Sequence, residues 1–189
     1  MMRLVIGCLL TLCWATTLAA DLPGDSLYRL QIPMQTAEGS TVALADLRGR
    51  PVLITLFYSE CSSVCPMITV RLQNIDRHLT PRARRDLTVL MLSLDSDRDS
   101  PQALRTFKQH HHIDDPRWIV ARADAGDVRA LAAVLGVRYR KLPDESFNHS
   151  AVITLVDREG VIKAHTEGVT ESEVAFARKV EFTAAAGRH

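Results

Sequence analysis

The sequence predicts an α/β fold in which helices cover a central sheet. Three observations support this class: strand and helix patterns alternate along the chain, a cysteine pair stands where the first core strand passes into a helix, and a β-hairpin and a helix come last. With 189 residues, 47% of them hydrophobic, the chain can bury a full core. No linker rich in Gly, Pro or Ser divides it, so we expect residues 21–189 to form a single domain.

The first elements are a short arm and a core strand. Residues 27–32 alternate weakly, residues 37–40 supply turn chemistry and residues 41–47 follow, which predicts an N-terminal hairpin or extended arm. The apolar run at 52–57 predicts a buried strand that ends directly before the cysteines.

Helical patterns follow the cysteines. Met67, Val70, Ile75 and Leu79 recur at three- and four-residue spacing and predict one helix, and an Asp-Ser-Pro sequence at 99–101 predicts the start of another. The remaining elements are expected as strands at 87–94 and 118–121, helices at 99–107 and 127–135, a hairpin of residues 151–156 and 161–164, and a last helix at 171–184.

The first twenty residues are typical of an export signal. A positive start at residues 1–3 precedes an uncharged run at 4–20 that ends in small residues. The alternative is a retained membrane anchor, because 17 uncharged residues lie at the lower limit for crossing a bilayer. We therefore expect a periplasmic or cell-envelope protein that meets the membrane only through this segment, if it is retained.

The charge balance excludes other classes. The chain carries 23 Lys and Arg against 22 Asp and Glu, with no run of like charges, which argues against nucleic-acid binding or a polybasic membrane surface. Phosphate loops and catalytic triads are also absent, so we expect neither a hydrolase nor a kinase.

Cys61 and Cys65 are the candidate chemical site. Cys8 and Cys13 lie in the leader, and a disulfide closing so short a loop between the remaining two would constrain the unfolded chain very little. We expect Pro66 to be the first helical residue and Cys65 to cap the helix, whose positive end favours thiolates. Two thiolates either form a redox pair or hold a soft metal: copper(I), or copper(II) or zinc if an imidazole joins them.

The fold that puts a cysteine pair at this junction is thioredoxin-like. In that fold the loop entering the strand at 151–156 faces the cysteines, and His149 stands in this loop. The histidines at 110–112 are expected at a solvated helix end, and His78 lies too far along its helix to reach back. His149 is therefore the candidate third ligand.

Three blocks of the sequence resemble the motifs of the SCO/SenC family, in the same order. FYSECSSVCP at 57–66 resembles its cysteine motif, LSLDSDRDSP at 92–101 its second-strand signature, and NHSA at 148–151 its histidine motif. The resemblance implies a thioredoxin-like fold, export, and one copper ion, Cu(I) or Cu(II), bound by Cys61, Cys65 and His149.

The resemblance also implies a function. Members of this family assemble the dinuclear copper centre of cytochrome c oxidase, as copper donors, as reductants of its cysteines, or both. The expected partner is therefore the copper-bearing subunit of the oxidase, or another copper or thiol-redox protein. One departure is that Ser62 and Ser63 stand where the family carries Pro-Asp, which makes the loop looser and less negative. Asp95 and Asp99 are either substitute carboxylates or turn and cap residues.

Three functions stay open from the residues themselves. A copper chaperone needs His149 as a ligand. A thiol–disulfide oxidoreductase of the same fold would use Cys61 as the attacking thiolate and Cys65 as the resolving thiol, without a stable metal. A binding or redox-sensing module would show neither metal nor turnover. Met34 and Met67 are soft donors in principle, but we expect both to pack in the core.

Overall fold

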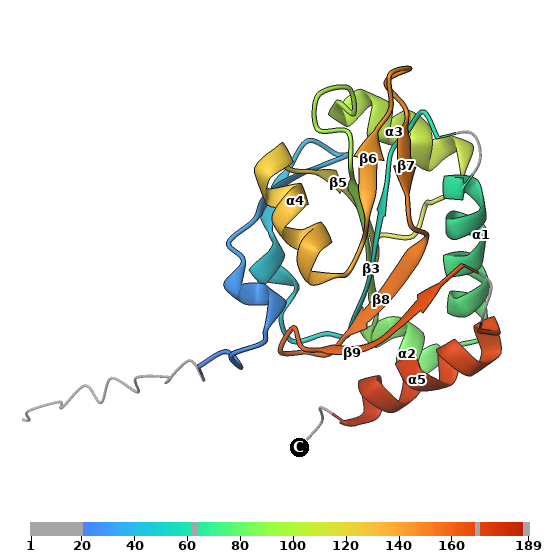
Figure 1. The fold of residues 1–189 in the computed structure, drawn as a ribbon. Helices are drawn as coiled ribbons and strands as arrows, with labels where there is room; N and C mark the ends of the chain where they lie inside the picture. The colour runs from blue at the N-terminus through green and yellow to red at the C-terminus, as the bar shows by residue number, and fades with distance from the viewer. Residues whose placement is uncertain (1–20, 62–63, 169–170, 187–189) are drawn as a thin grey trace, which may run out of the picture.

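The protein is built on one seven-stranded sheet, shown in Figure 1. The computed structural model describes residues 21–61, 64–168 and 171–186, and the predicted leader at 1–20 lies outside them. The strands are β1 (Pro33–Thr36), β2 (Thr41–Ala43), β3 (Val52–Phe57), β4 (Thr88–Ser93), β5 (Trp118–Arg122), β6 (Tyr139–Lys141), β7 (Phe147–His149), β8 (Val152–Val156) and β9 (Ile162–Glu167). The helices are α1 (Val64–Arg77), α2 (Pro81–Asp86), α3 (Pro101–His110), α4 (Ala125–Val134) and α5 (Glu173–Ala186), with short 3₁₀ turns η1 (Leu27–Arg29) and η2 (Leu44–Leu47).

The sheet confirms the predicted α/β class and its thioredoxin-like arrangement. Its strand order is β2-β1-β5-β4-β3-β8-β9, with β3, β4 and β5 parallel, β8 antiparallel to β3, and β9 antiparallel to β8. The predicted N-terminal hairpin forms as the antiparallel pair β1–β2, and β1 also pairs with β5. Its predicted bounds were wrong, because the first strand follows the predicted 27–32 segment, which begins with η1, and η2 replaces the end of the second strand. The carboxyl end of β3, where the cysteines follow, therefore lies in the middle of the sheet.

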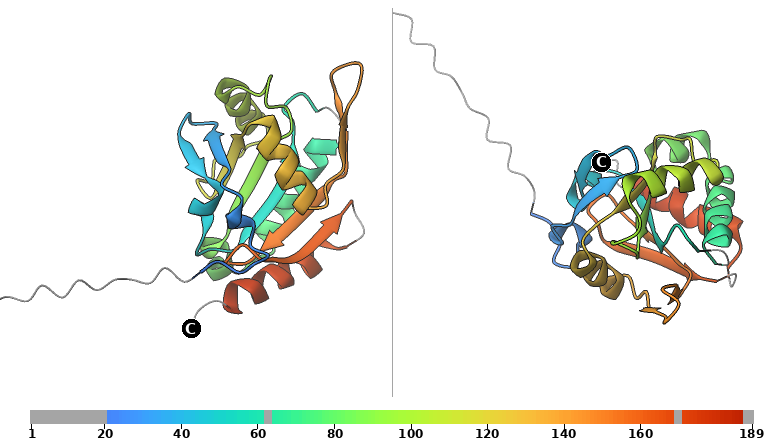
Figure 2. Two further views of the ribbon diagram at one scale, coloured as in Figure 1. Left: turned by 60° about the vertical axis from the view of Figure 1, so that its left-hand side comes forward. Right: turned by 90° about the horizontal axis from the view of Figure 1, so that it is seen from above.

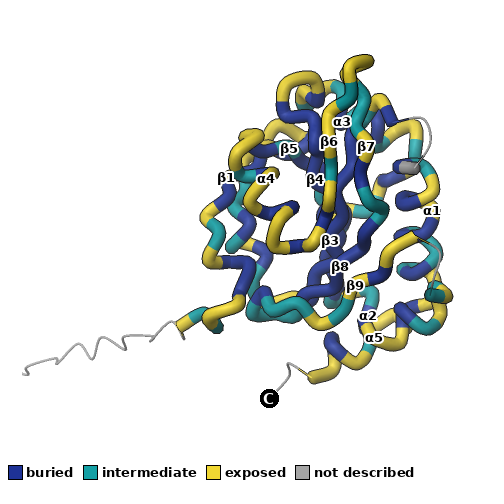
Figure 3. Tube along the Cα trace, viewed as in Figure 1, coloured by how far each residue is buried: buried dark blue, intermediate teal, exposed yellow. Residues whose placement is uncertain are grey.

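Each face of the sheet has its own core. Along β3, Leu53 and Phe57 face the helices α1, α2, α3 and α5, whereas Ile54 and Leu56 face α4 and the N-terminal segment. The two views in Figure 2 show these two layers of helix on either side of the strands. All six residues of β3 and of β4 are buried, which explains their continuous apolar sequence, and Figure 3 shows this buried centre.

The N-terminal segment packs at the end of the sheet away from the cysteines. Leu27 donates its backbone N–H to the carbonyl oxygen of Gly160 over 2.9 Å. Val156 pairs with Val52, so the β8–β9 turn at 157–160 lies beside the beginning of β3. Gly160 has a φ of 82°, and a Cβ added there would lie 2.7 Å from the Ser26 hydroxyl, so the turn needs glycine for this contact.

The predicted apolar face of helix α1 is half confirmed, since Ile75 and Leu79 are buried but the two earlier positions are not. Met67 and Val70 are 61% and 52% exposed, so the expectation that they belong to the apolar face, and that Met67 packs in the core, was wrong. Ile68 and Leu72 are buried instead, on the same face as Ile75. The helix carries two overlapping apolar stripes, and spacing alone does not say which one meets the sheet. Met34 is fully buried, as predicted.

Two features were missing from the prediction: helix α2 and the two-stranded hairpin β6–β7. Both are short, and the exposed residues of β6 and β7 are polar or charged, so neither leaves a strong periodic pattern. The Pro-Asp turn at 143–144 was the available signal for the hairpin. Within the described residues, no helix combines the length and the apolar character needed to cross a membrane.

The histidines at 110–112 end α3, as predicted. His112 adopts a φ of 52°, and the bonds His112 N–H to Gln109 O and Ile113 N–H to Lys108 O close a Schellman-like turn. Glycine is the residue that normally fills this left-handed position, because a Cβ is strained there.

We expect His112→Gly to raise the free energy of unfolding by about 0.5–1 kcal/mol, because it relieves this strain. Urea unfolding followed by circular dichroism measures the change. His110→Gly is the matched control, since His110 is the last residue of α3 and glycine should destabilise that position. A destabilised His112→Gly variant would contradict this explanation.

Candidate metal centre

The two cysteines lie where β3 passes into α1. Helix α1 begins at Val64, so Cys65 is in its first turn rather than at the cap, and the predicted cap position was wrong by one or two residues. The reason is visible in the hydrogen bonding: the sulfur of Cys61 accepts the backbone N–H of Cys65 over 3.3 Å. Cys61 thereby satisfies one of the free N–H groups at the start of the helix. Neither of these two cysteines forms a disulfide.

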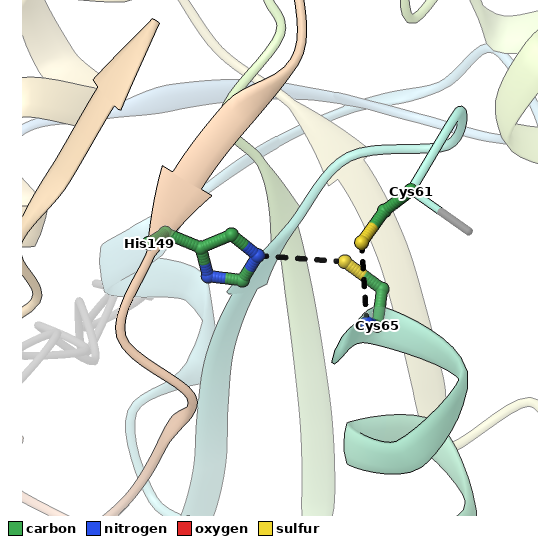
Figure 4. Close-up of side chains that lie close together, drawn as sticks. All are labelled: Cys61, Cys65 and His149. Atoms are coloured by element: carbon green, nitrogen blue, oxygen red, sulfur yellow. Dashed lines mark hydrogen bonds between the residues drawn. The ribbon is translucent and has the colours of Figure 1, made fainter. Parts of the chain in front are cut away.

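His149 meets the cysteines from the other side of the site. It is the last residue of β7, where it pairs with Tyr139 of β6. Its Nε2 lies 3.5 Å from the sulfur of Cys65, and its Nδ1 lies 3.2 Å from the carbonyl oxygen of Ser150. A carbonyl oxygen only accepts, so Nδ1 carries the hydrogen and the Nε2 lone pair of the neutral ring points at the sulfur. Figure 4 shows this orientation.

The hairpin that carries His149 is fixed to the loop after β4. The guanidinium group of Arg98 pairs with Asp95 and also donates to the carbonyl oxygen of Glu145 in the hairpin turn. Asp95 additionally accepts the backbone N–H of Arg98. Asp95 therefore acts as a turn residue and an ion-pair partner, which is one of its two predicted readings.

An aromatic wall borders the imidazole. The ring of Tyr58 stands edge-on to His149, with ring centroids 6.1 Å apart, and packs on Phe147 at 5.3 Å. Tyr58 is 6% exposed, and burial, together with the adjacent Cys61 sulfur, raises the pKa of its hydroxyl. The wall fixes the imidazole ring and keeps water from one side of the site.

The Cys65 thiol is a weaker acid than the sequence suggested. Its hydrogen bond with Cys61 and its complete burial raise its pKa well above the ordinary cysteine value. The helix end favours a thiolate at this position, as expected from the sequence, but the hydrogen bond with Cys61 and the burial of the sulfur act against it. A bound cation would restore the thiolate, since metals bind the deprotonated form.

The geometry of the three side chains fits a single soft metal ion. The sulfurs of Cys61 and Cys65 and one ring nitrogen of His149 all lie within 4.8 Å of one another. Metal bonds of about 2.3 Å to sulfur and about 2.0 Å to nitrogen place three ligand atoms roughly 4 Å apart around one ion. Two thiolates and one imidazole are a donor set that copper accepts in both oxidation states. No other such group of His, Cys, Asp and Glu occurs in the described part of the chain.

The structure leaves the remaining candidates outside this group. His78 follows α1 and His165 lies on β9, and both are exposed. Ser62 and Ser63, the departure from the family motif, lie outside the described residues. Asp99 is a buried carboxylate rather than a helix cap, because the hydroxyl of Ser100 caps α3 instead.

Comparisons with a family model and with curated proteins indicate one protein family. The family model SCO1/SenC matches residues 31–184. The SCO1 protein homolog of Bacillus subtilis is 24% identical over 84 residues, which are 44% of this chain and 43% of that protein. The chain spans less than two thirds of the length of the curated relatives that it matches.

Solved structures share the fold. Bradyrhizobium japonicum ScoI with copper bound gives a TM-score of 0.69 at 21% identity, over 80% of this chain and 96% of that one. BsSco, a member of the Sco family of cytochrome c oxidase assembly proteins in which a disulfide switch has been identified, gives 0.69 at 20% identity, over 81% of this chain and 91% of that one. At these identities the likeness establishes the thioredoxin-like arrangement alone.

Proposed function

The chain belongs to the SCO1/SenC family, and from that premise we propose that it binds copper through Cys61, Cys65 and His149 and serves the assembly of a copper protein. The recipient in this proposal is the copper-bearing subunit of cytochrome c oxidase. In this proposal copper is both the ion that the protein binds and the ion that it delivers. ScoI of Bradyrhizobium japonicum, a protein of the same fold, has been solved with copper bound, and this supports the proposal.

The convergence of three ligand atoms is the observation that carries the proposal. Cys61 lies in the loop after β3 and Cys65 in the first turn of α1, whereas His149 comes from a hairpin more than eighty positions later. The hydrogen bond from Nδ1 to Ser150 orients the ring before a metal binds. The imidazole therefore loses little conformational freedom when the metal binds. A site prepared in this way suits an ion that must be taken up selectively and then released.

A second candidate function is supported by the same two sulfurs. Two reduced cysteines whose sulfurs lie within 4.8 Å of each other can form a disulfide after a small movement. As a reductant, Cys61 would attack a disulfide of the partner and Cys65 would resolve the mixed disulfide, leaving the partner with two thiols and this chain with one disulfide. Cys61, at 8% exposed, is more accessible than Cys65 at 0%, in keeping with that order.

Copper stoichiometry tests the proposal directly. The reduced protein, titrated with Cu(I) against a competing chelator, is expected to retain one copper per chain. The absence of competitive binding would overturn the copper function. The disulfide-exchange function would then be tested by reduction of a disulfide-bonded peptide that carries the cysteine pair of the oxidase copper site.

The proposed setting is the cell envelope. The leader predicted at residues 1–20 would export the chain, and a periplasmic site is where a copper-bearing subunit that faces outward would receive its metal. Signal cleavage is tested by the mass of the protein isolated from cells. The mass of a chain that begins at Asp21 supports a cleaved signal, whereas the mass of the full-length chain in the membrane fraction supports a retained anchor.

A further inference from the structure

Asp99 is a buried acidic side chain beside the metal centre. It lies in the loop between β4 and α3 and is 1% exposed. Its carboxylate accepts the backbone N–H of Ser59 over 3.0 Å and hydrogen bonds from the hydroxyls of Ser59 and Ser93. Ser59 stands two residues before Cys61, so this carboxylate holds the loop that carries the first sulfur.

The charge of Asp99 is only partly balanced by the neighbouring Arg98. Arg98, the adjacent arginine, is paired with Asp95, and Asp99 forms no ion pair within the residues that the structure describes. Burial raises the pKa of its carboxyl group, while the hydrogen bonds from Ser59 and Ser93 favour the ionised form. The ionised carboxylate adds a small contribution to the raised pKa of the Cys65 thiol.

A negative charge on the Asp99 carboxylate distinguishes the two copper oxidation states. Binding Cu(I) with loss of two thiol protons changes the charge of the site by −1, because one positive charge replaces two. Binding Cu(II) with loss of the same two protons leaves the charge unchanged. A neighbouring anion therefore opposes the Cu(I) form and leaves the Cu(II) form nearly unaffected.

Resting on the proposed copper function, we infer that Asp99 is a specificity-determining residue that shifts the site toward Cu(II) and eases the release of Cu(I). It acts through space on the ligands and through Ser59 on the position of Cys61, without binding the metal. A site that holds Cu(I) less tightly transfers it more readily to a recipient with two thiolates.

The test compares Cu(I) and Cu(II) affinities of the purified protein in separate chelator competitions. Asp99→Asn keeps an oxygen that accepts the Ser59 N–H and removes the charge. We expect its Cu(I) affinity to rise about tenfold, the effect of one nearby unit charge in a protein interior, with little change for Cu(II). A tenfold rise in the ratio of Cu(I) affinity to Cu(II) affinity corresponds to a rise of about 59 mV in the midpoint potential of the bound copper.

Asp97→Asn is the matched control, because Asp97 is an exposed acid in the same loop and its charge is screened by water. It should change neither affinity. If Asp99→Asn does not fold, as judged by circular dichroism, Asp99→Ser removes the same charge and should give the same result.

The outcomes separate the two proposals. A wild-type protein that binds copper in neither state overturns the copper function and this inference with it. A wild-type protein that binds copper, together with a folded Asp99 variant whose two affinities are unchanged or fall in parallel, overturns the role of Asp99 alone. Parallel loss is what a purely structural role would give.

Discussion

His149→Ala is expected to abolish stoichiometric copper binding while leaving the two thiols reactive. The substitution removes the only nitrogen ligand of the Cys61, Cys65 and His149 group and leaves both sulfurs in place. Loss of a hydrogen-bond partner of a metal ligand typically lowers metal affinity 10- to 100-fold. Loss of the ligand itself should have a larger effect, so we expect the copper affinity to fall about 100-fold or more. Chelator competition measures it.

The matched control is His165→Ala, which removes an exposed imidazole from β9. It should bind copper like the wild type. Titration of the reduced mature protein with a chromogenic disulfide in denaturant gives the second readout and should count the two thiols of Cys61 and Cys65 in both variants. Copper retained at wild-type affinity in His149→Ala would remove this histidine from the ligand set.

Cys61→Ser is expected to abolish copper binding and disulfide exchange together. Its sulfur is a proposed ligand, the more exposed thiol, and the acceptor of the Cys65 N–H at the start of α1. A hydroxyl binds copper weakly and does not form a disulfide. Copper stoichiometry and the rate of reduction of a small disulfide substrate are the two measurements.

Cys65→Ser is the informative companion. It should also lose copper, but Cys61 can still attack a disulfide, and a mixed disulfide should accumulate because the resolving thiol is missing. Mass spectrometry detects that adduct. A mixed disulfide that forms in Cys61→Ser and not in Cys65→Ser would reverse the assigned order of attack.

The sequence was informative where chemistry is local and less so where it depends on packing. Cys61 and Cys65 could be found from their spacing after an apolar strand, and the structure places both at that junction. His149 needed the assumption of a fold, because its partners are distant in sequence and only the hairpin β6–β7 brings it to them. That hairpin itself was missed, since its short strands carry no strong pattern.

Burial explains the errors. The helix dipole suggested a thiolate at Cys65, but the sequence does not show that this sulfur would be fully enclosed. Met67 and Ile68 were equally plausible core residues from spacing, and only the angle at which α1 meets the sheet decides between them. Asp99 was left as either a cap or a carboxylate near the site. Its bonds to Ser59 and Ser93 join segments 40 and 6 positions away, and the first of these distances leaves no local pattern.

The contact between Leu27 and Gly160 determines how the molecule can be held. It places the beginning of the described chain beside the β8–β9 turn and the beginning of β3, whereas the cysteines follow the opposite, carboxyl end of β3. A tether, affinity tag or immobilising surface joined at the amino end therefore holds the molecule at the side away from the cysteines. The face that carries Cys61, Cys65 and His149 then points away from the attachment, free to meet a second protein, when the tether is joined to Asp21 in place of the predicted leader.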